Sequence, residues 1–176
     1  DRRVQISWMR GGSYPGMSFS QQMTIPVELS LRRDVDGIRL YRNPVRELDQ
    51  LVVDRRESVM LARDSVVELP ELASVAVELR WAGTEPIRIS ICGQAMTIWP
   101  EYGQVSFAGK TARLRDQGAT AIRFLIDRSS IEAFVDDGRS CFGLVRETAV
   151  DRTLQLHSTT ATAERVTIEV LRPAWV

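Results

Sequence analysis

Val75-Ala76-Val77-Glu78-Leu79-Arg80-Trp81 is the stretch of sequence that decides the fold, because its apolar side chains recur at every second position. This period is that of a β-strand with one face in a core and the other in water. Helical spacing is not sustained over a comparable window, and Leu48–Leu61 could hold only one turn of helix. The alternation recurs in three more runs of branched and aromatic residues, Ile87–Ile91, Ile122–Ile126 and Val166–Val170.

Turn signals separate these runs at short intervals. Asp36-Gly37 and Asp137-Gly138 each stand between two strand-like runs, and such pairs favour tight hairpin turns. Many short strands joined by tight turns indicate an antiparallel sandwich or barrel rather than an α/β fold. The sequence therefore predicts an all-β chain.

The overall composition suits a single domain with a sizeable core. The chain has 176 residues, of which 44% are hydrophobic. Its 23 Lys and Arg residues equal its 23 Asp and Glu residues, whereas a nucleic-acid binder usually carries a basic surplus. No apolar run is long enough to span a bilayer. We therefore expect neither a nucleic acid nor a membrane as partner.

Residues that commonly hold metals or act as nucleophiles are few. Cys92 and Cys141 lie in strand-like runs, where we expect small buried side chains, and a disulfide between them is the less favoured alternative. The single histidine, His157, cannot form a histidine-rich metal site, and we expect it on the outer face of a strand. The sequence has no CxxC, phosphate-binding glycine pattern or calcium loop. We predict no metal and no cofactor.

A pair of carboxylates could hydrolyse a glycosidic bond, and the candidates are Asp127 and Glu132, followed by Asp136 and Asp137. Their setting favours a structural role, because Asp and Ser side chains bond nearby backbone groups in turns. We expect Asp127 to cap a turn and Glu132 to be exposed on the next strand.

The first part of the chain differs from the rest. A Gly- and Pro-rich loop, Arg10–Met17, separates two strand-like runs, Val4–Met9 and Met23–Leu31. Such loops are often functional, because a rigid scaffold holds an irregular backbone whose side chains can reach a ligand. A soft boundary near Pro44–Asp49 divides this part, residues 1–46, from the regular sandwich, residues 47–176.

Two segments of the chain carry a specific resemblance. The first combines Val4–Met9 with Tyr14-Pro15-Gly16-Met17 and the run Gln22–Leu29. It resembles the last propeller blade of the family 32 glycoside hydrolases, which include levanases, inulinases and invertases. The second, Ile122–Gly138, is similar to the signature of that family's C-terminal sandwich. The order of the two segments matches the family, and the Tyr-Pro-Gly-Met loop is more like its levanase and fructanase branch.

The resemblance implies a two-sheet antiparallel β-sandwich of the concanavalin A (lectin-like) type, preceded by a strand pair from the end of a five-bladed β-propeller. It also implies that the catalytic acids lie in that propeller, in Trp-Met-Asn-Asp-Pro, Glu-Cys and Arg-Asp-Pro motifs. Here Trp8-Met9 is followed by Arg10-Gly11-Gly12, and the Arg-Asp pairs at Asp34 and Asp64 lack the proline. No catalytic residue carries over, so we expect an inactive part of a larger β-fructosidase or levanase.

We therefore expect a structural and docking module of a levanase, inulinase or invertase type enzyme, which stabilises the catalytic propeller and shapes its substrate groove. The alternative is an independent lectin-like carbohydrate-binding module, which an exposed row of aromatic residues on one sheet would support. The aromatic candidates are Trp81, Trp99 and Trp175. Aromatic residues in sandwich strands are more often core, so we expect all three in the core. Trp81 also shares its strand face with Val75 and Leu79, which supports this.

The expected partners also follow from the resemblance. They are the N-terminal catalytic propeller of the same protein and, in the intact enzyme, a fructan or sucrose-type carbohydrate. We expect Trp8 and Tyr14 near that sugar, and the alternative for Trp8 is the core of the blade. The apolar residues of Val4–Leu31 need cover, so we expect this segment to fold against the sandwich or to form a homodimer. An enzyme for polymeric fructan would be secreted or periplasmic.

Overall fold

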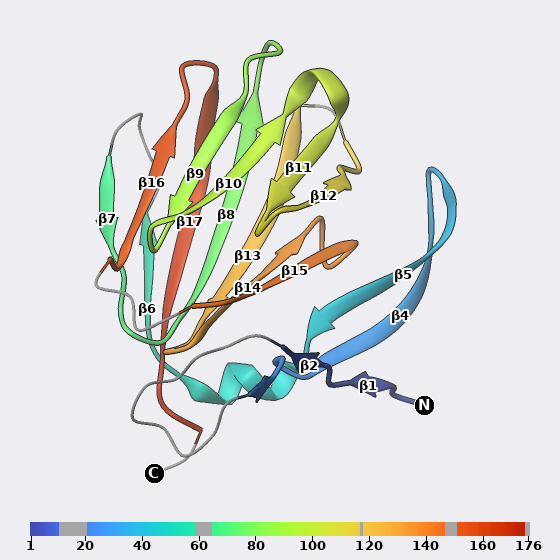
Figure 1. Cartoon of the computed structure of the whole chain (residues 1–176), viewed down its shortest axis with the longest axis vertical. Helices are drawn as coiled ribbons and strands as arrows, with labels where there is room; N and C mark the ends of the chain where they lie inside the picture. The colour runs from blue at the N-terminus through green and yellow to red at the C-terminus, as the bar shows by residue number, and fades with distance from the viewer. Residues whose placement is uncertain (11–20, 59–64, 117, 147–150, 175–176) are drawn as a thin grey trace.

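The computed structural model describes residues 1–10, 21–58, 65–116, 118–146 and 151–174. Over these residues, two six-stranded antiparallel sheets lie face to face, and two smaller sheets of three and two strands lie beside them (Figure 1). The described helical elements are two short 3-10 helices, η1 (Arg46–Leu51) and η2 (Pro100–Tyr102). The prediction of a two-sheet antiparallel β-sandwich is confirmed.

The first large sheet, which we call sheet I, has the strand order β15-β14-β13-β8-β17-β6. These strands are Ser140–Val145, Ser130–Val135, Ala119–Ile126, Ala73–Trp81, Ala161–Leu171 and Val52–Ser58. The second, sheet II, has the order β12-β11-β10-β9-β16-β7. Its strands are Lys110–Arg113, Gln104–Phe107, Gln94–Trp99, Ile87–Ile91, Thr153–His157 and Val66–Glu68. Hairpins connect β9 through β12 in sheet II and β13 through β15 in sheet I, whereas the chain crosses between the sheets at β6–β7, β7–β8, β8–β9, β12–β13, β15–β16 and β16–β17.

The core fills the space between sheets I and II. Alternate side chains of β8 are almost fully buried there, with Val75, Val77 and Leu79 at most 2% exposed. Phe107 of sheet II meets Phe124 of sheet I edge to face, with ring centroids 6.1 Å apart. Aromatic pairs in this geometry add a small attraction to the free energy of burial. The alternation in the sequence therefore predicts the inner faces correctly.

Trp81 marks the rim of this core. It is the last residue of β8, and its side chain is only half-buried, although it packs against the core as predicted. Trp99, which ends β10, is 38% exposed. Met96 and Ile98 lie an odd number of positions before Trp99 and are fully buried, so Trp99 lies on the outer face of sheet II. The prediction that these tryptophans lie in the core is partly right for Trp81 and wrong for Trp99. Trp175 lies outside the described residues.

Both predicted hairpin turns form. Gly37 joins β4 to β5 with φ +106°, and Gly138 lies between β14 and β15 with φ +80°. Asp136 and Asp137 precede Gly138 and also have positive φ, which Asp tolerates better than most residues. Glycine has no Cβ and adopts this backbone conformation at little cost, which is why both turns contain one.

The two small sheets form what we call the N-terminal segment, the described residues between 1 and 44. One sheet has the order β1-β4-β5, and the other pairs β2 with β3. The bounds of these strands are Val4–Gln5, Val27–Asp34, Gly37–Pro44, Trp8–Met9 and Gln22–Met23. Each of the two strands predicted in this region is broken in two, the first into β1 and β2 and the second into the two-residue β3 and the eight-residue β4. The second break coincides with Pro26, which has no N–H to donate to a ladder.

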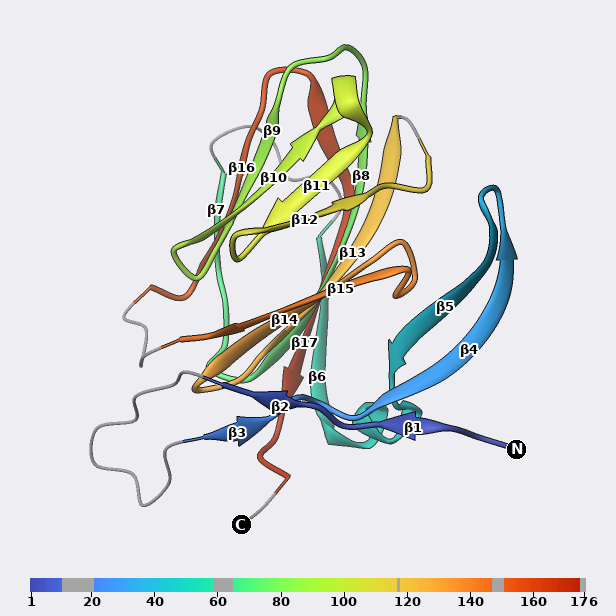
Figure 2. The ribbon, with the colours of Figure 1, turned by 45° about the vertical axis from the view of Figure 1, so that its right-hand side comes forward.

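The N-terminal segment packs on the outer face of sheet I, opposite the main core. Val27 of β4 contacts a second buried cluster formed by Leu125 of β13 and Phe134 of β14. The β4–β5 hairpin then extends alongside the sandwich and belongs to neither large sheet (Figure 2). Of the two expected outcomes for this segment, the structure shows folding against the sandwich.

Candidate functional site

A cavity of about 770 Å³ lies between the N-terminal segment and the edge of sheet I. Strands β2 and β4 line one side of it, and β14 and β15 line the other. Trp8, one of the two predicted sugar-binding residues, is on this cavity and is 52% exposed. The guanidinium of Arg10 lies 5.0 Å from the centre of its indole ring. Tyr14, the other predicted residue, lies outside the described residues.

Glu132 of β14 lies on the same cavity, and its predicted exposure is wrong. The residue is only 5% exposed, and its carboxylate accepts a hydrogen bond from the backbone N–H of Ile25 at 2.7 Å. Glu132 stands opposite Leu125 on the outer face of sheet I, which the N-terminal segment covers. Burial raises the pKa of this carboxyl to about 7.

Strand β14 explains why this carboxyl is buried. All six of its residues are buried, because its inner face meets sheet II and its outer face meets the N-terminal segment. Met9 covers the outer face of sheet I next to Glu132. Gly143 is the cross-strand partner of Glu132, and the Met9 methyl group lies so close to it that a Cβ on Gly143 would be only 3.1 Å away. The sequence carries a signal for this second covered face in the consecutive apolar residues Phe124-Leu125-Ile126.

The other acidic candidates have structural roles. Asp127 is exposed at the turn between β13 and β14, where its carboxylate accepts the backbone N–H of Arg128 at 2.7 Å. Asp136 is buried and accepts the backbone N–H of Arg115 at 2.7 Å and the Thr120 hydroxyl at 2.8 Å. The bond of Asp127 is the expected turn role, whereas Asp136 bonds residues that are distant in the sequence. Glu132 is the one candidate acid on the cavity among the described residues.

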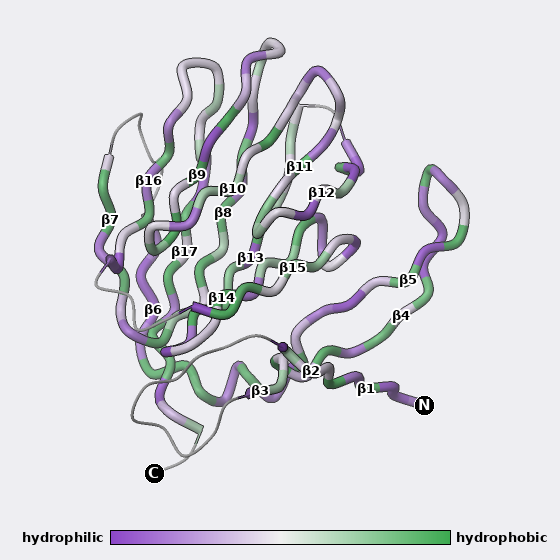
Figure 3. The backbone as a smooth tube through the Cα atoms, viewed as in Figure 1, coloured by the Kyte–Doolittle hydropathy of each residue, from purple (hydrophilic) through white to green (hydrophobic). Residues whose placement is uncertain are grey.

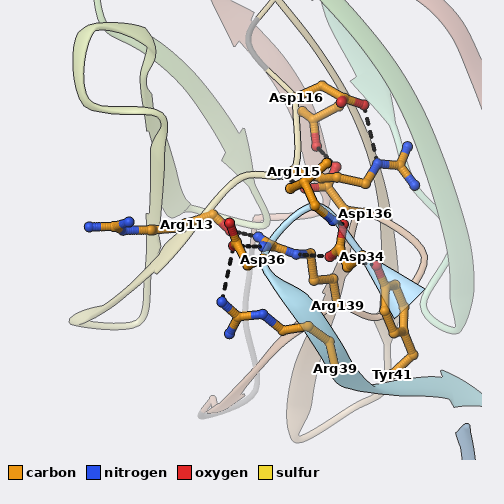
Figure 4. Close-up of polar contacts among 11 residues, drawn as sticks. Asp34, Asp36, Arg39, Tyr41, Arg113, Arg115, Asp116, Asp136 and Arg139 are labelled. Atoms are coloured by element: carbon orange, nitrogen blue, oxygen red, sulfur yellow. Dashed lines mark hydrogen bonds and ion pairs between the residues drawn. The ribbon is translucent and has the colours of Figure 1, made fainter. Parts of the chain in front are cut away.

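An ion-pair cluster joins the β4–β5 hairpin to the sandwich, and we call it the Arg139 cluster (Figure 4). Arg139, beside the turn between β14 and β15, donates to Asp34 and to Asp36, each at 2.6 Å. It also donates to the backbone carbonyl of Arg113 in sheet II at 2.9 Å. The Tyr41 hydroxyl donates to Asp34 at 2.9 Å. The cluster therefore connects the N-terminal segment with both large sheets.

The Arg139 cluster is largely shielded from solvent. The side chains of Arg139 and Asp34 are 6% and 3% exposed, whereas that of Asp36 is 42% exposed. The backbone N–H of Val35 and then the guanidinium of Arg139 hold the pKa of Asp34 down at about 2. In the sequence, Asp36 marks a hairpin turn, and Asp34 belongs to an Arg-Asp pair that lacks the family's proline. The sequence alone contains no signal that pairs them with Arg139.

Several large apolar side chains of the N-terminal segment are exposed, and together we call them the N-terminal apolar surface. They are Val4, Ile6, Trp8, Met23, Leu31, Val35 and Ile38, with exposures of 50% to 78%. Within the hairpin, Leu31 pairs with Leu40 and Arg33 with Ile38, so Leu31 and Ile38 project from one face. Figure 3 shows hydrophobic stretches along β4 and β5 outside the two packed sheets. This surface is unlike the outer faces of the sandwich, which are mostly polar.

The described residues hold no group of three or more metal-ligating side chains. Cys92 and Cys141 are free thiols, and burial raises the pKa of Cys141 to about 11, so this thiol stays protonated. His157 is exposed at the end of β16, as expected for the outer face of a strand. No helix among the described residues is long and apolar enough to cross a membrane.

Comparison with known proteins gives a consistent result. The family described as "Glycosyl hydrolases family 32 C terminal" matches residues 16–171. A levanase of Bacillus sp. (strain L7) is 24% identical over 179 residues, which cover 80% of this chain and 19% of the levanase. The chain thus spans about a fifth of the length of that relative.

Solved structures share the fold. The exo-inulinase from Aspergillus awamori superposes with a TM-score of 0.78 at 15% identity, over 98% of this chain and 41% of the enzyme. The family 32 β-fructofuranosidase of Bombyx mori has a TM-score of 0.73 at 21% identity, over 98% and 39%. Fructan 1-exohydrolase IIa from Cichorium intybus has a TM-score of 0.74 at 14% identity, over 98% and 46%.

Proposed function

Because this chain belongs to the C-terminal domains of family 32 glycosyl hydrolases, we propose that it is the docking module of a fructan-hydrolysing enzyme. In that role it packs against an N-terminal catalytic β-propeller, stabilises it and shapes its substrate groove. The intact enzyme is of the levanase, inulinase or invertase type and acts on fructan or sucrose-type carbohydrate. Secretion or a periplasmic location would suit a polymeric substrate. Residues 1–46 are the remainder of the last propeller blade, and residues 47–176 are the sandwich.

The observation that carries the proposal is the N-terminal apolar surface. Exposed apolar side chains that gather on one segment of a soluble protein often mark an interaction site. The segment that bears this surface is attached firmly to the sandwich through Val27 and the Arg139 cluster. These contacts hold the β4–β5 hairpin, which carries Leu31 and Ile38, in a defined position beside the sandwich, as an interdomain contact requires. Trp8 lies on the adjoining cavity, which supports its proposed place near the sugar.

The lectin-like alternative has less support. A sugar-binding sheet face usually carries several exposed aromatic residues at which sugar rings can stack. Among the described residues of the sandwich, only Trp99 at the end of β10 and Tyr102 in η2 are exposed aromatic side chains, at 38% and 62%. We therefore retain docking as the proposed function.

The docking proposal predicts a loss of stability that depends on the second domain. Leu31→Asp combined with Ile38→Asp should lower the thermal midpoint of the intact two-domain enzyme by several degrees, because two charges would be buried at the interface. In the present chain alone, the same pair should change the midpoint little, since both side chains are already about 70% exposed. Differential scanning calorimetry of both proteins measures this.

The matched control is Val53→Asp with Val66→Asp, on sandwich strands β6 and β7, where the exposures are 61% and 55%. This pair should leave both proteins unchanged, and an equal loss from both pairs would contradict a specific docking surface. Light scattering on the chain alone tests the homodimer. A dimer that dissociates when Leu31 and Ile38 are replaced would assign the same surface to self-association.

The second prediction is that the chain alone has no hydrolytic activity. It should release no reducing sugar from levan, inulin or sucrose above a protein-free baseline, because its sequence lacks the family's nucleophile and general-acid motifs. The intact enzyme serves as the positive control in the same assay. Turnover by the chain that disappears in Asp127→Asn or Glu132→Gln would overturn the assignment.

A further inference from the structure

Glu132 is an ionisable side chain buried where the N-terminal segment packs on sheet I. Its side chain is buried between β14 and the N-terminal segment, with Ile25 as its hydrogen-bond donor at 2.7 Å. Among the described residues, no Arg or Lys forms an ion pair with it, in contrast to Asp34 in the Arg139 cluster. An ionised carboxyl with so little compensation is costly to bury.

Charged and titratable groups approach Glu132 from every element packed around it. Asp127 comes from the turn before β14, and Cys141 from β15. Three cations line the same cavity: Arg10 after β2, Arg42 of β5 and Lys110 of β12. Arg10 lies over Trp8, and the Arg42 guanidinium reaches Gln5 at 3.4 Å.

We propose that the contact between Glu132 and Ile25 is proton-dependent, so that the N-terminal segment packs firmly on sheet I when the Glu132 carboxyl is neutral and loosens when it ionises. The released segment would expose Glu132 to water, where the carboxyl can ionise freely. The burial of Glu132 sets this direction, because an ionised carboxyl without a cation partner is costly to bury and the movement that exposes it to water also breaks its bond to Ile25.

The sign follows from linkage. Packing raises the pKa of Glu132 from 4.5 to about 7, chiefly by burial, with a smaller contribution from the charge of Asp127. The hydrogen bond from Ile25 lowers the pKa and is the second-largest effect, after burial. The packed state is therefore fully favoured below pH 4.5 and weakens as the pH rises from there through 7. The packing equilibrium should fall on the order of 100-fold over this range, since each unit of pKa difference contributes a factor of ten.

This inference depends only on residues of the present chain, so it can hold whether or not the docking proposal does. If docking also holds, the consequence for the intact enzyme is direct. Glu132 binds the N-terminal segment, which carries the N-terminal apolar surface. The contact between the two domains would therefore also weaken as the pH rises.

Amide hydrogen exchange of the ¹⁵N-labelled chain between pH 5 and 8.5 tests the proposal. The protection factor of Ile25, corrected for the intrinsic exchange rate, should fall on the order of 100-fold with rising pH. In Glu132→Gln it should stay constant, because the amide is neutral throughout. Amides of β8, in the centre of sheet I, serve as the internal control and should keep their protection in both proteins.

Protection of Ile25 that is independent of pH in the unmodified chain, or that falls equally in Glu132→Gln, would overturn the proposal. A second measurement does not depend on the variant folding. The ¹³Cδ resonance of Glu132 in the unmodified chain should titrate near neutral pH. A midpoint at or below 4.5, the ordinary value for this carboxyl, would overturn the proposal by itself.

Discussion

Gly138→Ala is expected to lower the free energy of unfolding by about 3–5 kcal/mol, although it adds only one methyl group. Gly138 has φ +80°, a conformation that alanine adopts only with strain. The turn also lies directly against β5, where the Arg42 N–H donates to the Gly138 carbonyl at 2.9 Å. A Cβ on Gly138 would overlap the carbonyl oxygen of Arg42 and lie 2.6 Å from its carbonyl carbon. Backbone atoms cannot rotate away as a side chain can, so the hairpin must separate from the sandwich.

Gly109→Ala is the matched control, because it isolates the backbone strain. Gly109 has φ +72°, and a Cβ placed on it meets no atom within 4 Å. This substitution should cost about 1 kcal/mol, the strain of a left-handed alanine alone. Urea unfolding followed by tryptophan fluorescence gives both values. Equal losses at the two positions would mean that the contact between the β14–β15 turn and β5 contributes nothing to stability.

Arg139→Met is expected to lower the free energy of unfolding by about 2–3 kcal/mol. The substitution keeps much of the side-chain volume but removes the charge that binds two carboxylates and the donor to the Arg113 carbonyl. The range lies below that for a fully dry ion pair, because Asp36 is partly solvated. Chemical unfolding measures the loss.

Arg165→Met is the control for removing an arginine from the surface. Arg165 pairs with Glu78 at 3.6 Å, and the two side chains are 63% and 52% exposed. Exposed pairs of this kind contribute little, so the control should stay within about 0.5 kcal/mol of the unmodified chain. If Arg139→Met is equally mild, the Arg139 cluster does not attach the hairpin to the sandwich.

The Arg139 cluster should also make the chain sensitive to acid. The pKa of Asp34 is lowered from 3.8 to about 2 in the folded chain, first by the Val35 N–H and then by Arg139. The stability that this ionised carboxylate contributes is present above pH 4 and is lost as the pH falls towards 2. In Arg139→Met this part of the pH dependence should be shallower, because one of the two main causes of the shift is gone.

Gly138 and Arg139 both hold the β4–β5 hairpin against the sandwich. Gly138 allows the β14–β15 turn to approach β5, and Arg139, the next residue, fixes the far end of the hairpin through Asp34. Glu132 acts at the other end of the N-terminal segment, near Ile25. Loss of the Gly138 or the Arg139 contact should therefore let the hairpin move away from the sandwich. Docking through Leu31 and Ile38 should then weaken, even where the sandwich itself stays folded.

Local patterns in the sequence were sufficient for the sandwich. The alternation in Val75–Trp81 and the turn at Asp137-Gly138 both involve residues within one strand or one hairpin, and the structure has them as predicted. The family could also be recognised, because its signature in Ile122–Gly138 is a continuous run. A strand's period and a tight turn's geometry depend on neighbours in the chain, so they can be read without knowing the tertiary contacts.

The site depends on contacts between residues that lie far apart in the sequence. Ile25 and Glu132 are 107 positions apart, and Asp34 and Arg139 are 105 apart. The consecutive apolar residues Phe124-Leu125-Ile126 indicate that both faces of β13 are covered, but nothing near Glu132 shows that Ile25 covers its carboxyl, so the raised pKa was not predictable. The same holds for Asp34, which has the sequence of an ordinary turn. Alternation along a strand shows which side chains share a face, but the packing of distant segments decides which faces meet water and which charges meet each other.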